Sequence, residues 1–298
     1  MLKLELIKKR GNKMKIEARN TLDNTTIIQI NELEAIVQTH DGTYHDIYLD
    51  NRFNFDQRMP AFLFAWVENY LIGFLSIYAD NIEEAELSVI VHPTYRQQGI
   101  ATALIEQAKE IIKSFRIGDI SYISERRFIE KTNYLHRTYQ IDWHETEYLM
   151  EAKEMVEQEY PEATIQVRKA VMTDARSIAS FQAKAFESSF QEAMTYAEGS
   201  IGEDDHEIFV FLNQEGDIVG SSSVNTTEEY YYLFGLAVDP NYQGQGFGTQ
   251  GIYQMMKQLN AEDERPFRLS VEKENAHAKH LYQKNGFRVI SEVVYLNE

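Results

Sequence analysis

The second half of the chain contains Asp239-Pro240-Asn241-Tyr242-Gln243-Gly244-Gln245-Gly246-Phe247-Gly248, and the first half contains His92-Pro93-Thr94-Tyr95-Arg96-Gln97-Gln98-Gly99-Ile100-Ala101. The offset between residues 92 and 239 is 147, close to half of the 298 residues. Gly73 and Gly220 keep this offset, as do Tyr148 and Tyr295. A constant offset of this size predicts a duplicated domain, because solenoid repeats are only about 20–50 residues long.

Length and composition place the chain among globular proteins. A chain of 298 residues with 43% hydrophobic and 12% aromatic residues can form two cores. Apolar runs stay shorter than the roughly 18 residues of a membrane span, and the charged alternation of residues 1–6 predicts no signal peptide. The absence of cysteine excludes disulfides and thiolate nucleophiles. We therefore expect a cytoplasmic protein without a membrane partner.

The net charge of −18 comes from 47 acidic and 29 basic residues. Nucleic-acid binders are normally basic, so we expect no nucleic-acid partner. The acidity is compatible with attraction of a cationic small substrate, although solubility alone is the favoured explanation. The eight histidines show no ligand spacing, so the sequence predicts no metal site. It makes no prediction about oligomeric state.

A charged segment separates the two copies. Residues 151–163 favour a helix that Pro161 would stop, and we interpret them as a linker. The expected domains are therefore residues 1–150 and residues 164–298. The expected strands of the second domain are 164–168, 207–212, 218–224, 230–238, 267–271 and 289–295; the expected helices are 175–186, one starting near 248, and 276–284.

This order puts three antiparallel strands before a strand–helix–strand unit. The fold class is therefore α+β, with a mixed, mostly antiparallel sheet flanked by helices in each domain. The polar stretch 191–207 is expected to be irregular.

The repeated loop has the composition of an anion site. Residues 243–249 lie between an expected strand and an expected helix. Glycines allow a tight turn, and a helix N-terminus offers unpaired N–H groups to a pyrophosphate. A dinucleotide-binding Rossmann loop would need a parallel sheet and an acidic residue at a strand end about 20 residues later. Here a hairpin and a meander precede the loop, and Asp263 and Glu264 come before the next expected strand. A Walker loop is excluded because Gly-Lys-Ser/Thr does not occur.

These residues resemble the GNAT (Gcn5-related) N-acetyltransferases, whose acyl-CoA loop reads Gln/Arg-x-x-Gly-x-Gly/Ala after Val-x-Pro. Both copies fit this pattern. The family's second motif, Asn-x-x-Ala-x-x-x-Tyr-x-Lys-x-Gly-Phe, is met in the second half by Asn275, Ala278, Tyr282, Lys284, Gly286 and Phe287. The doubled layout is similar to tandem GNAT proteins of the mycothiol-synthase type, a similarity of architecture that does not carry the substrate with it.

The first half departs from the second motif. Phe128 replaces Asn275, Leu135 replaces Tyr282, and Tyr139-Gln140 replace Gly286-Phe287. Tyr134 is one residue out of register, which would rotate it by about 100° on a helix. We interpret the first domain as degenerate and the second as catalytic. A candidate second CoA site in the first domain comprises Val89, Val91, Arg96, Gln97, Gln98, Gly99, Ile100 and Ala101.

The resemblance implies an acetyl-CoA-dependent N-acetyltransferase that needs no metal and acts on a primary amine in a ternary complex. Tyr282 would protonate the departing thiolate. The implied cofactor-binding residues are Leu236, Ala237, Val238, Gln243, Gly244, Gln245, Gly246, Phe247, Gly248, Thr249 and Asn275. The alternative for Tyr282 is an ordinary core tyrosine.

The sequence does not determine the general base or the acceptor substrate. Glu228 and Glu229 precede the strand expected to face the substrate, and Glu229 is the candidate base. The two carboxylates could equally be solvated charges at a strand end. Two other functions compete with acetylation of a small amine. One is a non-catalytic CoA or acyl-CoA sensor, and the other is acetylation of a protein or peptide.

Overall fold

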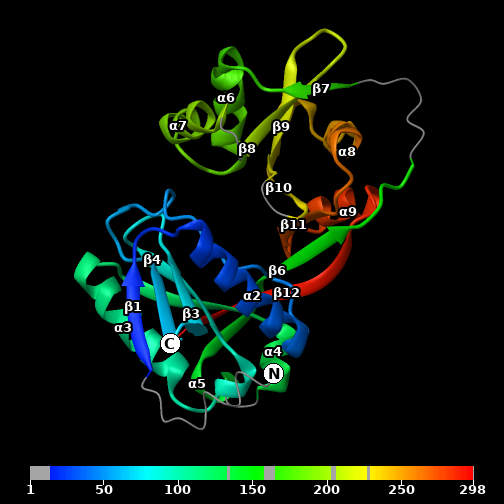
Figure 1. The fold of residues 1–298 in the computed structure, drawn as a ribbon. Coiled ribbons are helices and arrows are strands. Elements are labelled where there is room, and N and C mark those ends of the chain that lie inside the picture. Colours follow the sequence, from blue (N-terminus) through cyan, green and yellow to red (C-terminus); the bar gives the residue numbers. More distant parts are fainter. Residues whose placement is uncertain (1–13, 133–134, 158–164, 203–205, 227–228, 298) are drawn as a thin grey trace. The chain divides into compact units, whose positions relative to one another are not determined.

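The structure is a computed structural model that describes residues 14–132, 135–157, 165–202, 206–226 and 229–297. The chain divides into two compact units. Unit 1 comprises residues 1–146 and 291–298, and unit 2 comprises residues 147–290. Figure 1 shows the elements of both units.

Unit 1 is built on a mixed sheet with strand order β1-β2-β3-β4-β5-β12. Adjacent strands of this sheet pair antiparallel, except that β4 and β5 pair in parallel. Its elements are β1 (Lys15–Arg19), α2 (Asn24–Asp41), β2 (Phe62–Val67), β3 (Tyr70–Tyr78), β4 (Glu84–Val91), η1 (Pro93–Tyr95), α3 (Ile100–Phe115), β5 (Asp119–Glu125), α4 (Arg126–Lys131), α5 (Leu135–Thr138) and the start of β6 (Gln140–Ala152).

Unit 2 has the strand order β6-β11-β10-β9-β8-β7, and only β10 and β11 pair in parallel. Its elements after β6 are β7 (Gln166–Lys169), η2 (Met172–Asp174), α6 (Ala175–Ala185), α7 (Phe190–Ser200), β8 (His206–Leu212), β9 (Ile218–Asn225), β10 (Tyr231–Val238), η3 (Pro240–Tyr242), α8 (Phe247–Glu262), β11 (Phe267–Glu272), α9 (Ala276–Lys284) and the start of β12 (Arg288–Asn297).

The duplication is visible in the element bounds. The strands β4 and β10, the turns η1 and η3, and the helices α3 and α8 all begin and end 147 residues apart. Each unit also carries the predicted hairpin, strand, helix and strand in the predicted order. The predicted α+β fold class, with a mixed and mostly antiparallel sheet in each unit, is confirmed.

The two units exchange their last strands. The end of β6 pairs with β11 of unit 2, with Leu149 opposite Ser270. The end of β12 pairs with β5 of unit 1, with Leu296 opposite Tyr122. Residues 289–295 were expected to belong to the second domain, whereas the end of β12 completes the sheet of unit 1. The alternation of apolar and polar residues in a strand indicates which residues face the core, but it does not indicate which strand pairs with it. The pattern of residues 289–295 therefore fits a partner strand in either unit.

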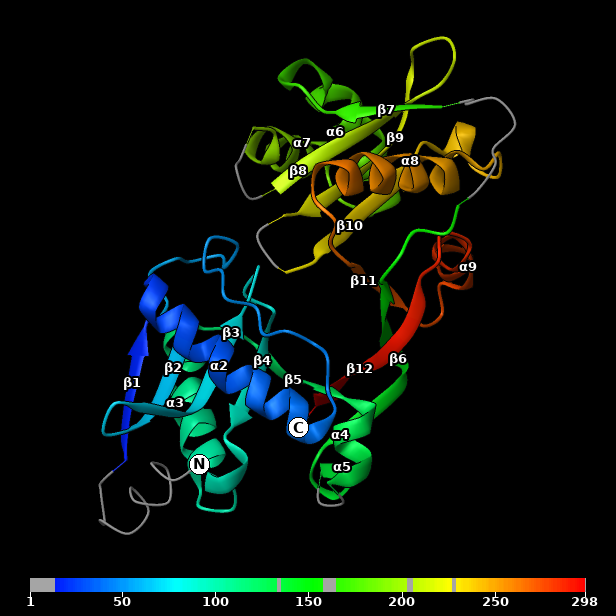
Figure 2. The same ribbon diagram turned by 45° about the vertical axis from the view of Figure 1, so that its right-hand side comes forward.

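Helices cover both faces of the unit 2 sheet. In β8, Ile208 and Val210 pack with α6 and α7, while Phe209 and Phe211 pack with α8. Successive strand residues point to opposite faces, so α8 and the α6–α7 pair lie on different sides; Figure 2 shows α8 in front of the strands.

The stretch 191–207, expected to be irregular, contains the helix α7 instead. Ser189 caps it by accepting a hydrogen bond from the Glu192 N–H, and the Glu192 carboxylate accepts one from the Ser189 N–H. Ala193 and Ala197 are buried on its inner face. The prediction was wrong because the capping box supplies a helix start that the polar composition conceals.

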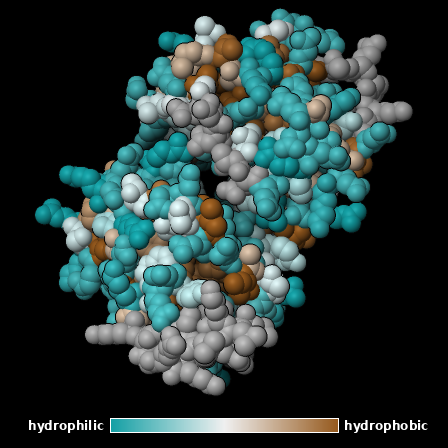
Figure 3. Space-filling view, in the orientation of Figure 1, coloured by the Kyte–Doolittle hydropathy of each residue, from teal (hydrophilic) through white to brown (hydrophobic). Residues whose placement is uncertain are grey.

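The visible surface is mostly hydrophilic (Figure 3), in keeping with the acidic composition. No helix within the described part of the chain is long and apolar enough to cross a membrane. The described residues also contain no group of three or more His, Cys, Asp or Glu residues that could hold a metal ion.

Candidate active site

The loop before α8 has the backbone geometry of an anion cradle. Gly244 and Gly246 have φ values of 74° and 85°, and Gly246 is the N-cap of α8 without a side-chain cap. A Cβ added at Gly244 would meet nothing within 4 Å, and one at Gly246 only the Gln250 amide nitrogen at 3.8 Å. The first-turn N–H groups of a helix have no intrahelical partners, so this open loop can hold a pyrophosphate.

Side chains of the loop hold it against the end of β10. The Gln243 amide donates to the Val238 carbonyl over 3.0 Å, and the Gln245 amide donates to the Asn241 carbonyl over 3.3 Å. The Asp239 carboxylate accepts from the Asn241 N–H over 2.9 Å. The Gln243 side chain therefore stabilises the loop instead of pointing toward a ligand. The groups of the loop that could bind a ligand are its backbone N–H groups.

β10 carries a bulge next to this loop. Ser223 is opposite Phe234 and Ser221 is opposite Ala237, so two residues of β10 face one residue of β9. Gly235 lies in the bulge with a φ of 62°. A bulge leaves a strand residue outside the ladder, and here it frees backbone groups beside Leu236 for a ligand. Ala237 itself is buried among α6 and α7, so only its backbone is available.

The parallel strands of the site separate after a short contact. β10 pairs with β11 only at Tyr231–Phe267 and Tyr232–Arg268. Residues 233–238 therefore diverge from β11 before the chain reaches the glycine loop. The resulting splay lets a ligand held at the start of α8 reach the backbone of β10.

α9 brings the second motif to this splay. The Asn275 side chain caps α9 by accepting from the Ala278 N–H over 3.0 Å. In the last turn of α9, Tyr282 packs edge-on against Phe287 with ring centroids 5.8 Å apart. The Asn285 amide donates to the Thr249 carbonyl over 3.2 Å and so ties α9 to the first turn of α8. Tyr282 and the loop are thus held by one rigid arrangement.

Tyr282 is a neutral phenol in this environment. Burial raises its pKa to about 12, and the nearby Tyr232 adds to the shift. The side chain is 9% exposed, and its hydroxyl makes no hydrogen bond to any residue that the structure describes. A protonated hydroxyl without a protein partner can donate its proton to a ligand that reaches it.

The candidate base is less well placed. Glu229 is exposed and lies in the bend before β10, and Glu228 falls outside the described residues. Gly235 is four residue steps of about 3.3 Å each beyond Tyr231, so the start of β10 is roughly 13 Å from the bulge. Tyr134 also falls outside the described residues.

Unit 1 keeps the loop in a modified form. Gly99 caps α3 with a φ of 77°, and Gln97, which corresponds to Gly244, has a φ of 61°. The Arg96 Nε donates to the Val91 carbonyl over 3.0 Å, just as Gln243 bonds to Val238. Strand β4 pairs with β3 without interruption from Gly73–Val91 to Tyr78–Glu86, so it has no bulge where β10 has one.

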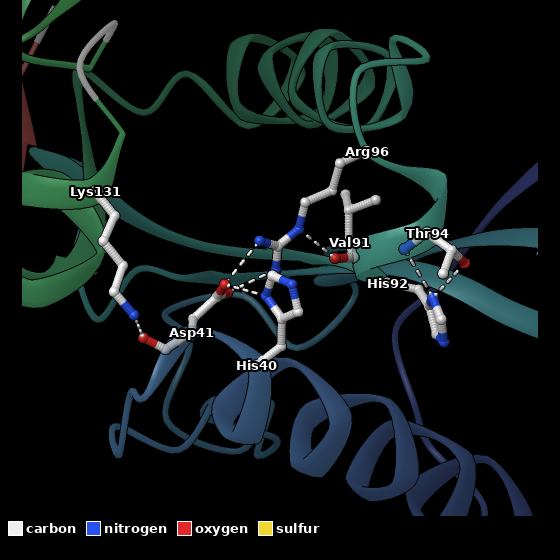
Figure 4. Close-up of polar contacts among 7 residues, drawn as sticks. All are labelled: His40, Asp41, Val91, His92, Thr94, Arg96 and Lys131. Atoms are coloured by element: carbon white, nitrogen blue, oxygen red, sulfur yellow. Dashed lines mark hydrogen bonds and ion pairs between the residues drawn. The ribbon is translucent and has the colours of Figure 1, made fainter.

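Arg96 also forms a cluster that the sequence analysis missed (Figure 4). Its two terminal nitrogens donate to the Asp41 carboxylate over 2.8 and 2.6 Å, and the Lys131 ammonium donates to the Asp41 carbonyl over 2.6 Å. His40 contacts the same carboxylate over 2.8 Å, and the His92 ring beside them accepts from the Thr94 N–H over 3.3 Å. Asp41 ends α2, far from Arg96 in sequence, so no local pattern could have paired them.

A cavity of about 570 Å³ lies within unit 1. It extends from α2 through the β4–β5 splay to the start of α3. Phe128 and Leu135, which replace Asn275 and Tyr282, form part of its apolar wall. The residues of the predicted second CoA site that line it are Val89, Val91, Arg96, Gln97, Gly99, Ile100 and Ala101. Gln98 is exposed and bonds instead to the Thr94 carbonyl over 3.5 Å.

Comparison with known proteins agrees with this geometry. The model of the acetyltransferase (GNAT) family matches residues 26–154 and again residues 175–287. The chain therefore belongs to the GNAT family, with one copy of the family's domain in each half, and it is an N-acetyltransferase.

Similar proteins that cover most of this chain are found in sequence and in structure. The mycothiol acetyltransferase of Saccharomonospora viridis is 25% identical over 248 residues, which are 74% of this chain and 77% of that protein. A GCN5-related N-acetyltransferase from Sphaerobacter thermophilus has a TM-score of 0.74 at 17% identity, covering 96% of this chain and 95% of that one. A tandem GNAT protein from the clavulanic acid biosynthesis pathway has a TM-score of 0.67 at 14% identity, with coverages of 96% and 98%. At such identities the structural likeness concerns the fold.

Proposed function

We propose that unit 2 transfers the acetyl group of acetyl-CoA directly to a primary amine of a small molecule in a ternary complex. The observation that carries this proposal is the combination in unit 2 of an open αL-glycine loop, the β10 bulge and the unpaired Tyr282 hydroxyl. Unit 1 has the loop without the bulge or the tyrosine. Catalysis therefore belongs to unit 2.

The pyrophosphate of acetyl-CoA is placed on the backbone N–H groups from Gly244 to Thr249. Its pantetheine arm follows Leu236 and Val238 into the splay, where the freed backbone groups of the bulge can bond to it. The Asn275 side chain is engaged in capping α9, so it acts by holding that helix in place.

The reaction forms a bond from the amine nitrogen to the acetyl carbon and breaks the bond from that carbon to sulfur. The amine loses one proton to a base, and the departing thiolate takes one from the Tyr282 hydroxyl, which solvent then restores. The position of Glu229 at the start of β10 suits a water chain to the amine rather than direct contact.

Unit 1 is proposed to bind CoA or acetyl-CoA without transferring the acetyl group. Its cavity and retained loop support binding, while Leu135 cannot donate a proton to a thiolate. A CoA sensor and a peptide acetyltransferase remain the alternatives for the whole chain. The absence of cysteine supports action in the cytoplasm, and the acidic composition is compatible with a cationic small amine.

Thiol release tests the proposal. Because the chain has no cysteine, every free thiol that appears in a mixture of protein, acetyl-CoA and amine belongs to CoA. A panel of small primary amines, with the matched alcohols as controls, should reveal thiol release that saturates with the amine. Release stimulated only by lysine-containing peptides would favour peptide acetylation, and binding of acetyl-CoA without release on any acceptor would favour a sensor.

A further inference from the structure

The loop 43–47 of unit 1 is held by three polar side chains from two different elements. From α2, the Glu34 carboxylate accepts the Ile47 N–H over 2.6 Å, and the Gln38 amide donates to the His45 carbonyl over 3.2 Å. From the end of β5, the Glu125 carboxylate accepts the N–H of Tyr44 over 2.8 Å and that of His45 over 3.0 Å. This short loop is therefore fixed on both sides, and His45 lies at its centre.

Glu125 is a buried carboxylate with neutral partners. It is 4% exposed, and besides the two backbone N–H groups it accepts the Ser291 hydroxyl. It forms no ion pair with any residue that the structure describes. Buried carboxylates normally have a cationic partner, because an uncompensated charge away from water is costly. The corresponding residue of unit 2, Glu272, is exposed and needs no such partner.

The His45 imidazole stands beside this carboxylate in the cavity wall. Burial lowers its pKa, although Glu125 and Asp46 act in the opposite direction. The ring is therefore neutral at pH 7 and carries one nitrogen that accepts a hydrogen bond. Within the described residues the ring has no hydrogen-bond partner.

The cationic side chains among the cavity-lining residues are Arg96 and Lys131, and neither is bonded to Glu125. Arg96 pairs with the Asp41 carboxylate, and Lys131 donates to the Asp41 backbone carbonyl. The wall formed by α2, the loop and β5 thus combines buried negative charge with a neutral hydrogen-bond acceptor. A ligand that complements it carries positive charge and N–H donors.

We propose that this wall of the unit 1 cavity binds the ammonium group of a small primary amine, with Glu125 supplying the negative charge and His45 accepting one N–H. A cavity of about 570 Å³ leaves room for an aliphatic or aromatic side chain of that amine among Val37, Ile47 and Tyr122. This site lies in unit 1 and is separate from the transfer proposed for unit 2.

Nuclear magnetic resonance of the full chain with isotope-labelled histidine tests the proposal, with n-butylamine as the probe and 1-butanol as its neutral match. The His45→Gln variant assigns the His45 signal. We expect n-butylamine to move the His45 signal saturably, and 1-butanol to leave it in place. Glu125→Gln should lower the affinity for n-butylamine at least about tenfold. The matched change Glu272→Gln and the variant Tyr282→Phe should leave that affinity unchanged.

Equal shifts with the amine and the alcohol, or no saturable shift with the amine, would overturn the proposal. So would an unchanged affinity in Glu125→Gln. If Glu125→Gln does not fold, the smaller change Glu125→Asp replaces it in the same experiment, because it withdraws the carboxylate from the wall and the His45 signal reports on unit 1 alone. An amine affinity equal to that of the wild type would then contradict the site.

Discussion

At the scale of single residues, the site depends on backbone geometry that only glycine adopts easily. Gly244 and Gly246 have positive φ values and face open space, so side chains there would enter the ligand's path. The sequence predicted this loop because glycines between a strand and a helix are a local signal. It could not predict the Asp41–Arg96 pair, which depends on tertiary contact.

The variant Gly246→Asp should abolish tight binding of acetyl-CoA by unit 2, because it places a carboxylate where the pyrophosphate approaches. We expect a loss of well over tenfold in affinity by calorimetry. Gly216→Asp is the matched control, since Gly216 has a φ of 88° and open space in the hairpin turn before β9, outside residues 243–249. Equal effects of the two variants would attribute the loss to strain and remove the loop from the site.

The raised pKa of Tyr282 has a consequence for the dependence of turnover on pH. Because burial, with Tyr232, raises that pKa to about 12, the phenol keeps its proton well above the ordinary value of about 10. The rate constant kcat should therefore show no decline near pH 10 from loss of this proton. A declining limb near pH 10 that Tyr282→Phe eliminates would contradict the assignment of the shift.

At the scale of elements, the sequence predicted those whose signals are local. The helix α9 begins and ends where Asn275 and the repeat pattern place it, and the strands of the hairpins agree to within about a residue. The helix α7 was missed because its buried face consists of small residues, Ala193 and Ala197. The bulge of β10 was missed because the offset of 147 holds across it, so the sequence carries no sign of the slipped register.

The ion pair of Asp41 should stabilise unit 1 in a pH-dependent way. Burial alone would raise the pKa of Asp41, but the hydrogen bonds from Arg96 and His40 outweigh it and lower that pKa. The stabilisation is therefore present above the unfolded value of about 3.9 and is lost as the pH falls through the folded value. Asp41→Asn should cost about 3 kcal/mol of unfolding free energy at pH 7 and less at pH 3.

Denaturant unfolding at the two pH values checks this expectation. Asp56→Asn is the control, because Asp56 pairs with Arg58 at the surface and its loss should change little. An equal cost for Asp41→Asn at pH 3 and pH 7 would show that the pair contributes packing rather than charge.

At the scale of the whole molecule, duplication and strand exchange together define the units. A sequence repeat indicates that two similar domains exist, but it cannot show which copy supplies the last strand of each sheet. Val294 and Leu296 belong to the core of unit 1, whereas Met150 and Ala152 belong to that of unit 2. The ends of the two repeats are therefore structural parts of the opposite unit.

The pair Leu296 and Leu149 tests this exchange, since the two residues are 147 apart and each is 3% exposed. Each change to Ala should cost about 2–5 kcal/mol. In hydrogen exchange, Leu296→Ala should loosen β2 to β5 and spare β8 to β11, and Leu149→Ala should do the reverse. If Leu296→Ala loosens unit 2 instead, the strands are not exchanged in solution.

The central claim is that unit 2 transfers the acetyl group with Tyr282 as the acid. Its most direct test is the steady-state kcat of Tyr282→Phe beside that of Tyr253→Phe, which removes a hydroxyl from a buried tyrosine of α8 in the same unit. We predict that Tyr282→Phe lowers kcat by about 10²–10⁴-fold at nearly unchanged acetyl-CoA affinity, and that Tyr253→Phe changes kcat little. A kcat of Tyr282→Phe equal to that of the wild type would contradict the claim.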